Sequence, residues 1–302
     1  MASTAAASAI ELGGAAARPH RSMLSDTIRA LRRQPMALAG LGVVLTWLLL
    51  GILAPVLPLQ DPIYQDLSVR LRPPSRDHIF GTDELGRDMV SRVIYGARVT
   101  VPAGIAVILV TATFGSLLGA IAGHFGGLVD SVIMRLSDAI LSFPSIILAM
   151  AITAIRGGPG LSNALIAVGF VLWPEYARLM RSQVLAIRAQ EFVTAADALG
   201  ASRMRILFRH ILPSTDAPLV VKATLDVGAA IVLTAGLSFL GLGAVPPTAE
   251  WGAMIKLGAD KGLQYWWYAA FPGLAIMSVV MGLNFFGDGL RDALDPRRRG
   301  RW

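Results

Sequence analysis

The chain has 302 residues, of which 54% are hydrophobic and only 16% are charged. Soluble domains contain about 25% charged residues, so this composition excludes an ordinary soluble protein and favours an integral membrane protein. The absence of cysteine excludes disulfides, thioether-linked haem and thiolate metal sites in this chain. The formal net charge is +7, but the basic residues lie beside hydrophobic runs. This placement follows the positive-inside rule for membrane proteins and predicts no nucleic-acid partner.

Residues 1–34 are rich in alanine and then basic, with Arg18, Arg21, Arg29, Arg32 and Arg33. A signal peptide would need a short apolar core and a cleavage site soon after Met1, and the sequence has neither feature. We therefore expect a cytoplasmic N-terminal tail with an interfacial helix over residues 23–33, which leads into the first membrane span.

We expect an all-α polytopic membrane protein with six transmembrane helices, because several apolar runs reach the ~20 residues that a bilayer requires. The predicted spans are 38–57, 99–123, 130–155, 161–176, 217–242 and 269–286. The third span contains Ser142-Phe143-Pro144, where a kink is expected. Basic residues at the C-terminal end (Arg291, Arg297, Arg298, Arg299 and Arg301) place that end on the same, cytoplasmic side as the N-terminus.

The segment 60–98 is expected to lie outside, since its charges balance. Six arginines (Arg70, Arg72, Arg76, Arg87, Arg92 and Arg98) face six acidic residues (Asp61, Asp66, Asp77, Asp83, Glu84 and Asp88). From Leu85 onward, the apolar positions Leu85, Met89, Val93, Ile94 and Ala97 predict a helix on the membrane surface. For Asp83, Glu84 and Asp88 we favour pairing with the neighbouring arginines, and a site for a hard cation is the alternative.

Charged residues also occur in or near the predicted spans. We expect Arg135 to pair with Asp138, Glu175 with Arg178, and Lys222 with Asp226, because each pair is three or four residues apart on one helix. A role in a transport pathway is the alternative for Arg135 and Asp138. The segment 245–268 is expected outside, and its aromatic residues 265–268 predict an interfacial belt, with ligand stacking as the alternative.

The loop between spans four and five, EFVTAADALGASRMRILFRHILP (191–213), is polar and basic between apolar segments. We expect two short helices bent at Gly200, with Ser202 capping the second helix and Pro213 ending it. One apolar face comprises Phe192, Ala195, Ala196 and Leu199, and the other comprises Met204, Leu207, Phe208 and Ile211. The spacing Thr194-Ala195-Ala196, three residues, Gly200, nine residues, His210-Ile211-Leu212-Pro213 resembles the EAA signature of ABC-importer permeases. Thr194 replaces the usual Glu, and His210 replaces the usual Ile.

From about residue 23 to residue 295 the order of segments resembles the dipeptide/oligopeptide/nickel family of these permeases, in its second-subunit (C-type) form. The run 78–98, HIFGTDELGRDMVSRVIYGAR, is similar to a segment found in the same branch. The resemblance implies the type I ABC-importer permease fold. We divide the chain into a tail with an interfacial helix (1–34), the first span with its outer segment (35–98), a core permease domain (99–291) with coupling helices at about 190–213, and a cytoplasmic C-terminal tail (292–302).

The resemblance further implies a transport subunit of the bacterial inner membrane, with a homologous permease, two cytoplasmic ABC ATPases and an extracytoplasmic binding protein as partners. No cofactor is expected in this chain, because the ATPases bind ATP and Mg. The cargo would be di- or oligopeptides, with nickel or another small solute as the alternative and a self-contained secondary transporter as the competing class. No catalytic motif is present, so the chain is not expected to be an enzyme. The residues expected to contact the ATPase are Glu191, Thr194, Ala195, Ala196, Gly200, Arg203, Met204, Leu207, Phe208, Ile211 and Pro213.

Overall fold

The computed structural model describes residues 23–294, and within that range it is helical, with a single isolated bridge between Thr82 and Asp88. The long helices are α3 (Pro35–Leu53), α4 (Met89–Phe125), α5 (Gly127–Leu141), α6 (Ser145–Ile155), α7 (Leu161–Arg188), α10 (Asp216–Phe239) and α12 (Trp266–Leu294). The shorter ones are α2 (Met23–Arg32), α8 (Glu191–Ala198), α9 (Arg203–Ile206) and α11 (Trp251–Ala259). The predicted tails at 1–22 and 295–302 lie outside the described residues.

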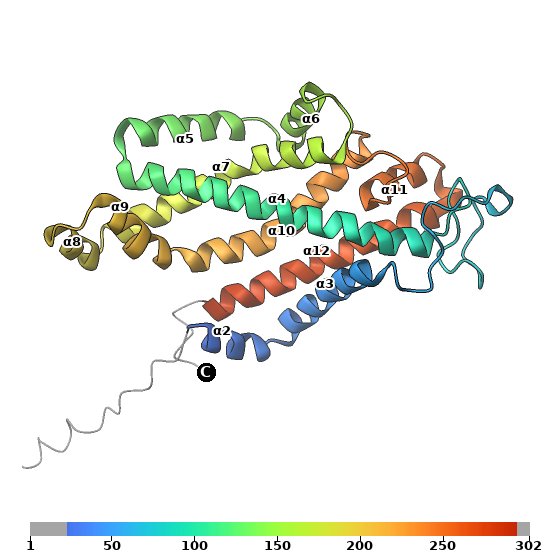
Figure 1. The fold of residues 1–302 in the computed structure, drawn as a ribbon, viewed down its shortest axis with the longest axis horizontal. Helices are drawn as coiled ribbons and strands as arrows, with labels where there is room; N and C mark the ends of the chain where they lie inside the picture. The colour runs from blue at the N-terminus through green and yellow to red at the C-terminus, as the bar shows by residue number, and fades with distance from the viewer. Residues whose placement is uncertain (1–22, 295–302) are drawn as a thin grey trace, which may run out of the picture.

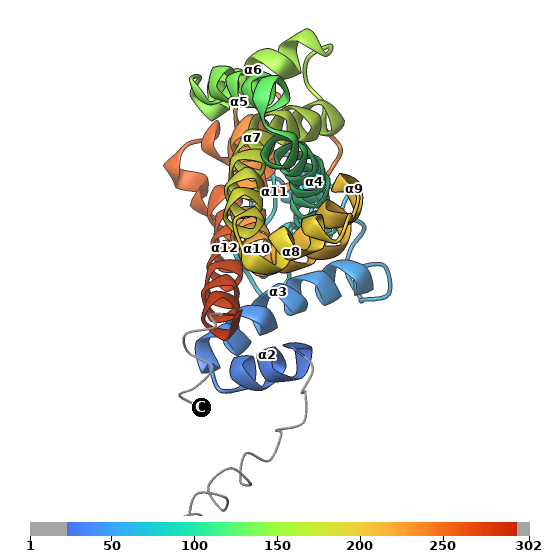
Figure 2. The ribbon, with the colours of Figure 1, turned by 90° about the vertical axis from the view of Figure 1, so that its left-hand side faces the viewer.

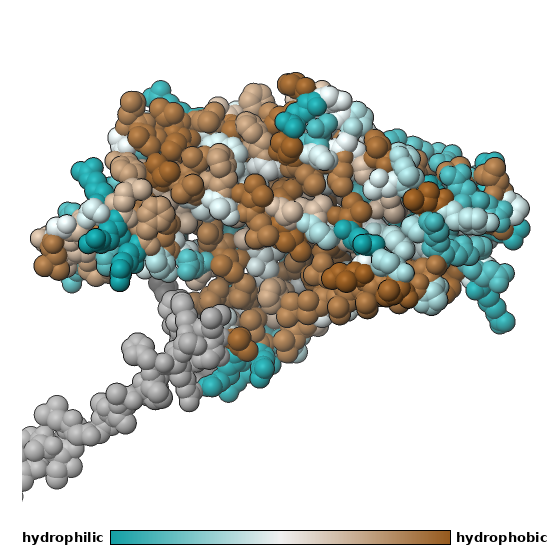
Figure 3. Space-filling model, viewed as in Figure 1, coloured by the Kyte–Doolittle hydropathy of each residue, from teal (hydrophilic) through white to brown (hydrophobic). Residues whose placement is uncertain are grey.

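Long helices run along the longest axis of the molecule, and the polar segments gather at its two ends (Figures 1 and 3). The loop with α8 and α9 lies at one end, while the segment between α3 and α4 and the helix α11 lie at the other. Seen along that axis, α4, α7 and α10 form the centre, with α5 and α6 on one side and α2 and α3 on the other (Figure 2). The two polar ends with an apolar middle are the arrangement expected of a membrane-spanning protein.

Four helices in the range 23–294 are long and apolar enough to cross a membrane singly: α3, α4, α10 and α12. The pair α5 and α6 passes the same test together but bends by 97°. Helix α7 has 28 residues, yet it is more polar, with Glu175, Arg178, Arg181 and Arg188 along its second half. The structure is therefore compatible with the six predicted spans, of which the third is broken rather than kinked.

The central helices α4 and α7 pack closely because glycines on α4 face the backbone of α7. A Cβ on Gly115 would collide with the carbonyl oxygen of Trp173, and a Cβ on Gly119 would collide with that of Ala177. A Cβ on Gly123 would lie 3.0 Å from the carbonyl oxygen of Arg181. Small residues permit this approach between membrane helices, where packing rather than the hydrophobic effect holds helices together.

Helix α4 corrects the expectation of a separate surface helix before the second span. The helix starts at Met89, capped by the Asp88 side chain, and continues without a break for 37 residues. Met89, Val93 and Ala97 are not directed at the membrane surface, because each is at most 1% exposed and belongs to the main core. The apolar stripe was read correctly as helical, but its partner is protein, including the fully buried Trp251 of α11.

Two of the three predicted ion pairs within helices are wrong. Asp138 of α5 pairs with Arg178 of α7 rather than with Arg135, and Glu175 pairs with Lys222 of α10 at 2.7 Å. The predicted pair of Lys222 with Asp226 is confirmed at 2.9 Å. Local spacing gives only the pairs that one helix permits, whereas the packed helices offer partners on neighbouring helices.

The predicted aromatic belt at 265–268 is divided by the fold. Trp266 is 55% exposed, as a belt residue would be, but Trp267 and Tyr268 are buried. The indole Nε1 of Trp267 donates a hydrogen bond of 3.2 Å to the carbonyl oxygen of Thr82. Trp267 therefore fixes the outer segment to α12.

We expect Gly119→Val to prevent correct packing of α4 against α7. Overpacking commonly costs about 1–3 kcal/mol, and this side chain would meet backbone that cannot rotate away. The measurement is the yield and melting temperature of monodisperse protein in mild detergent. Gly42→Val is the matched control, since a Cβ at Gly42 of α3 meets nothing within 4 Å. Equal yields and melting temperatures for the two variants would contradict the close contact.

Candidate functional site

The 191–213 loop begins with α8 and turns at a glycine, as the sequence predicts. Gly200 has a φ of +80°, which L-residues with a side chain rarely adopt. The N–H of Gly200 donates to the carbonyl oxygen of Asp197 at 2.9 Å, and the N–H of Ala201 donates to that of Ala196 at 3.1 Å. These two bonds form a Schellman motif, the usual way in which a glycine ends a helix. The bend is therefore a defined structure rather than a flexible link.

The second half of the loop is helical but irregular. Ser202 caps α9, since its hydroxyl accepts a hydrogen bond from the N–H of Arg205 at 3.4 Å. After one α-helical turn the chain forms a π-helix at Leu207–Ile211 and a 3-10 turn at Leu212–Ser214. The wider π-helical turn is a rare form that often occurs at functional sites. The sequence predicted the cap and the helix but not this change of helix type.

One face of the loop is buried against the membrane domain. Val193, Ile206, Leu207 and Ile211 are at most 4% exposed. They form a cluster with Ala120 of α4 and with Met180, Val184 and Ile187 of α7. We call the four loop residues the inner face. Val193 and Ile206 were missed as site residues, although their apolar character in a polar loop was the available signal.

The opposite face of the loop is apolar and exposed. Phe192 is 45% exposed, Leu199 89%, Met204 52% and Phe208 52%. We call these four residues the outer face. Burying apolar area stabilises by roughly 25 cal/mol per Å², so an exposed group of this kind at the polar end of the molecule suits a protein contact.

The predicted site residues are thus divided between the two faces. Leu207 and Ile211 lie on the inner face, and Ala196 is half-buried beside it. Met204 and Phe208 lie on the outer face. The remaining predicted residues are exposed: Glu191, Thr194, Ala195, Gly200, Arg203 and Pro213. Thr194, which replaces the usual Glu, donates a weak hydrogen bond of 3.4 Å to the carbonyl oxygen of Gln190 within its own helix.

Charged side chains connect the helices near this end of the molecule. Arg181 of α7 holds Asp130 of α5 through two hydrogen bonds of 2.5 and 2.6 Å. Arg188 at the end of α7 donates to the carbonyl oxygen of His124 at the end of α4, at 3.0 Å. A two-pronged arginine contact fixes orientation as well as distance. The helix ends that support the loop are therefore tied to each other.

The opposite end of the molecule contains a second polar cluster. Asp83 is fully buried, and its carboxylate accepts hydrogen bonds from the N–H groups of Leu85 and Arg87 and from Nε of Arg87. Glu84 pairs with Lys261 at 2.5 Å, and Asp88 contacts His78 at 3.1 Å. Pairing with arginine is confirmed for Asp83, while Glu84 and Asp88 have other partners. Among the described residues, no group of three or more His, Cys, Asp or Glu could hold a metal ion.

A buried carboxylate also begins α11 at this end. Glu250 is 1% exposed, and it accepts hydrogen bonds from the N–H groups of Gly252 and Ala253 at 2.9 and 2.8 Å. Burial raises the pKa of Glu250 above its ordinary value, and the two backbone donors oppose this change only in part. The side chain therefore serves as the cap that fixes α11 next to α4.

Comparison with known families gives two matches. Residues 115–300 match the family described as "Binding-protein-dependent transport system inner membrane component". Residues 22–74 match the "N-terminal TM domain of oligopeptide transport permease C". The first match includes the whole 191–213 loop, and the second includes α2 and α3.

Individual relatives are similar over nearly their whole length. The probable D,D-dipeptide transport system permease protein DdpC of Escherichia coli K12 is 46% identical over 90% of this chain and 91% of its own. The dipeptide transport system permease protein DppC of Alkalihalophilus pseudofirmus is 44% identical over 91% of this chain and 90% of its own. A solved structure of the MetNI methionine ABC transporter in inward-facing conformations matches with a TM-score of 0.51 at 20% identity. That match covers 68% of this chain and 98% of the other, and it shows the fold alone.

The two faces of the loop predict opposite responses to mutation. We expect Leu207→Ala to lower the free energy of local unfolding of the loop by about 2–5 kcal/mol, as deletion of a buried leucine side chain usually does. The matched change Phe208→Ala, at the neighbouring exposed position, should alter stability by no more than about 0.5 kcal/mol. Hydrogen exchange of residues 191–213 in detergent measures both effects. Equal exchange rates in the two variants would contradict the assignment of the faces.

Proposed function

We propose a role in peptide import for this chain, which belongs to the family of binding-protein-dependent transport system inner membrane components. It is a C-type permease subunit of an ATP-binding-cassette importer and not an enzyme. In this proposal it forms, with a homologous permease, a path through the bilayer for di- or oligopeptides. Its 191–213 loop transmits the motion of a cytoplasmic ATPase to that path.

The observation that best supports the coupling role is the division of the 191–213 loop into two faces. The inner face is held by α4 and α7, while the side chains of the outer face are 45–89% exposed. A segment that transmits force needs both properties, because it must be fixed to the part that moves and free to contact the part that pushes. The Schellman turn at Gly200 keeps the two halves at a set angle.

Proposed ATPase contacts come from the outer face and the exposed residues around it. Leu199 and Phe208 supply apolar area for a cleft in the ATPase. Arg203 and the exposed Glu191 would orient the loop at the rim of that contact. Leu207 and Ile211 would act from the inside, by keeping the loop attached to the membrane domain. ATP and Mg would be bound by the partner subunits.

Peptide cargo is supported by the names of the relatives. The two permeases described above are named for D,D-dipeptide and dipeptide transport, and a third, from Pseudomonas aeruginosa, is named for di/tripeptide transport at 43% identity over 91% of this chain. We propose the same class of cargo here, delivered by an extracytoplasmic binding protein. Nickel or another small solute moved by the same machinery remains the competing cargo.

The proposed setting is a bacterial inner membrane with both termini in the cytoplasm. The basic residues of the 191–213 loop support this orientation, since arginines favour the cytoplasmic side. The proposed division is 1–34 for the tail and interfacial helix, 35–98 for the first span and outer segment, 99–291 for the core, and 292–302 for the C-terminal tail. The boundary at 98/99 falls inside α4, and the boundary at 291/292 falls inside α12.

Coupling is tested by Leu199→Asp and Phe208→Asp in the complete importer. A carboxylate in an apolar contact is costly to bury, so we expect about a tenfold or greater loss of ATPase subunits that co-purify, with the same loss of labelled dipeptide uptake. Both residues are exposed, so the melting temperature of the isolated chain should not change.

Ile79→Asp is the control for that experiment. Ile79 is 65% exposed and lies in the outer segment, far from the loop. This variant should retain the ATPase subunits. The coupling role is excluded if the loop variants retain ATPase as well as the control does. If the wild-type importer takes up nickel but no dipeptide, the proposed cargo is wrong and nickel takes its place.

Orientation is tested with single cysteines, which need no prior removal of others because the chain has none. Asp77→Cys and Ser202→Cys place a thiol at an exposed position at each end. A maleimide that cannot cross membranes should label position 77 in spheroplasts and position 202 only after lysis. Labelling of position 202 in intact spheroplasts would contradict the proposed topology.

A further inference from the structure

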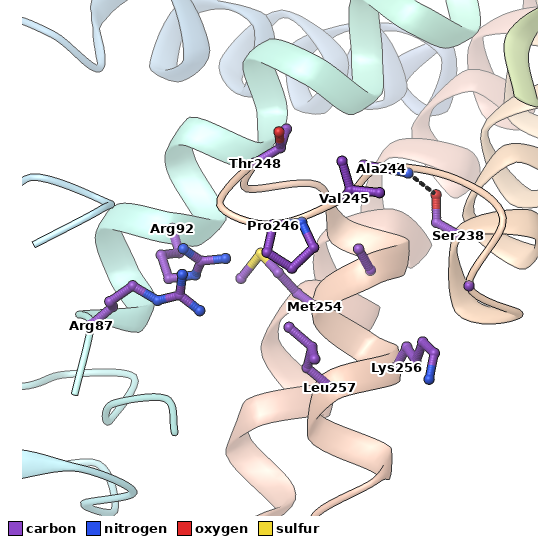
Figure 4. Close-up of a pocket in the computed structure, with 12 residues that line it drawn as sticks. Arg87, Arg92, Ser238, Ala244, Val245, Pro246, Thr248, Met254, Lys256 and Leu257 are labelled. Carbon is purple, nitrogen blue, oxygen red and sulfur yellow. Dashed lines mark hydrogen bonds between the residues drawn. The ribbon is translucent and has the colours of Figure 1, made fainter. Parts of the chain in front are cut away.

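The outer end of the molecule has a small cavity between α11, the start of α4 and the segment 244–248. Its volume is about 200 Å³, and its wall is mostly apolar, with Val245, Pro246, Met254 and Leu257. Three basic side chains also line it, and none of its lining residues is acidic: the three are Arg87, Arg92 and Lys256. Figure 4 shows the guanidinium groups of Arg87 and Arg92 side by side, directed toward Pro246 and Met254. The cavity therefore combines apolar walls with two positive groups at one side.

The two arginines are buried with only one negative partner. Each side chain is 2% exposed, and Asp83 is the carboxylate that contacts both. Nε of Arg87 lies 2.5 Å from this carboxylate, but Nε of Arg92 lies 3.5 Å from it, which is too long for a good hydrogen bond. Two buried positive charges thus share one negative charge, and a buried charge without compensation is costly.

Arg92 is also short of hydrogen-bond partners. Its Nη1 donates to the carbonyl oxygen of Pro62 at 3.0 Å, but its Nε is a buried nitrogen with no hydrogen-bond acceptor in the described part of the chain. Buried polar atoms are nearly always paired in folded proteins. This Nε is enclosed beside Asp83, so the donors left for an acceptor from elsewhere are the other guanidinium N–H groups of Arg87 and Arg92, which line the cavity.

Neighbouring charges do not supply this acceptor. Glu84 is engaged by Lys261, and Asp88 by His78. Glu250 is used to cap α11. On the opposite wall, Lys256 is compensated by Asp260 at 3.1 Å. The positive charge in excess is therefore localised at Arg87 and Arg92.

The position of the cavity suits a ligand that arrives from outside the membrane. Helix α4 has 37 residues, or about 55 Å at 1.5 Å per residue, whereas the hydrocarbon core is about 30 Å thick. Arg92 lies in the first turn of α4, and the 191–213 loop lies at the other end of this helix. In the topology proposed above, the cavity therefore lies at the extracytoplasmic end.

We propose that this cavity is a binding site for a carboxylate that carries a short aliphatic group. The carboxylate would neutralise the excess positive charge of Arg87 and Arg92 and accept bidentate hydrogen bonds of the type that arginine favours. The apolar wall would contact the aliphatic part. Its source is either the C-terminal carboxylate of the transported peptide or an acidic side chain of the delivering protein. The first source rests on the proposed function, whereas the site itself does not.

Binding is tested first on the wild-type importer by thermal unfolding with acetate, acetamide or sodium chloride at equal ionic strength. Acetate should raise the melting temperature by about 2–4 °C at saturation. Acetamide and chloride should have no such effect, because they lack the carboxylate or the aliphatic group. Equal effects of the three additives would overturn the site, and this comparison needs no variant.

Arg92→Lys then tests the residue. Lysine keeps the charge but loses the planar pair of donors, so the acetate-specific rise should disappear while the variant still unfolds cooperatively. Arg98→Gln is the matched control, on the same helix and exposed, and it should keep the rise. A rise that persists in Arg92→Lys would overturn the assignment of this side chain.

The source of the carboxylate is decided by uptake of a dipeptide and of its C-terminal amide. If the peptide supplies the group, the wild type should prefer the free acid by about tenfold, and Arg92→Lys should remove this preference. If the delivering protein supplies it, Arg92→Lys should weaken binding of that protein equally for acid and amide. If the wild-type importer takes up no dipeptide but still shows the acetate effect, the peptide proposal is refuted and the carboxylate site stands.

Discussion

The contact between α4 and α7 is the constraint on which the rest of the structure depends. Gly115 and Gly119 bring α4 against the backbone of α7 at Trp173 and Ala177, with no room for a side chain. This contact covers the second half of α4, whereas the first half packs against α10 and α11 at Gly104 and Gly96. The inner face of the 191–213 loop packs near the C-terminal ends of α4 and α7, and the buried Arg87 and Arg92 lie at the N-terminal end of α4.

The same pair of helices supports the 191–213 loop. A force applied to the 191–213 loop acts on Met180, Val184 and Ile187 of α7 and on Ala120 of α4 through buried contacts. The ties from Arg181 to Asp130 and from Arg188 to the end of α4 resist sliding between these helices and α5. Packed helices of this kind move as units rather than deform continuously. The loop is therefore firmly attached to α7 and to the second half of α4.

Local signals in the sequence predicted the local structure well. Gly200, Ser202 and the alternation of apolar spans with basic segments sufficed for the turn, the cap and the membrane class. The family spacing around Gly200 led to the permease family, which the comparisons then confirmed. The cause in each case is a residue whose chemistry acts on its immediate neighbours.

Features set by distant contacts could not be read from the sequence. The fourth span was predicted to end at residue 176, but α7 continues to Arg188 and so creates the surface that buries Val193 and Ile206. Asp138 has a nearby arginine in sequence, yet it pairs with Arg178 forty residues away. The shortage of negative charge around Arg92 depends on which side chains the fold brings together.

The most direct measurement is a photo-crosslink from position 199, the most exposed residue of the outer face. A photoreactive phenylalanine derivative placed there in the assembled importer should form an adduct with an ATPase subunit, and its yield should change when ATP is bound. Adducts with lipid or with an extracytoplasmic protein, and none with an ATPase, would contradict the account.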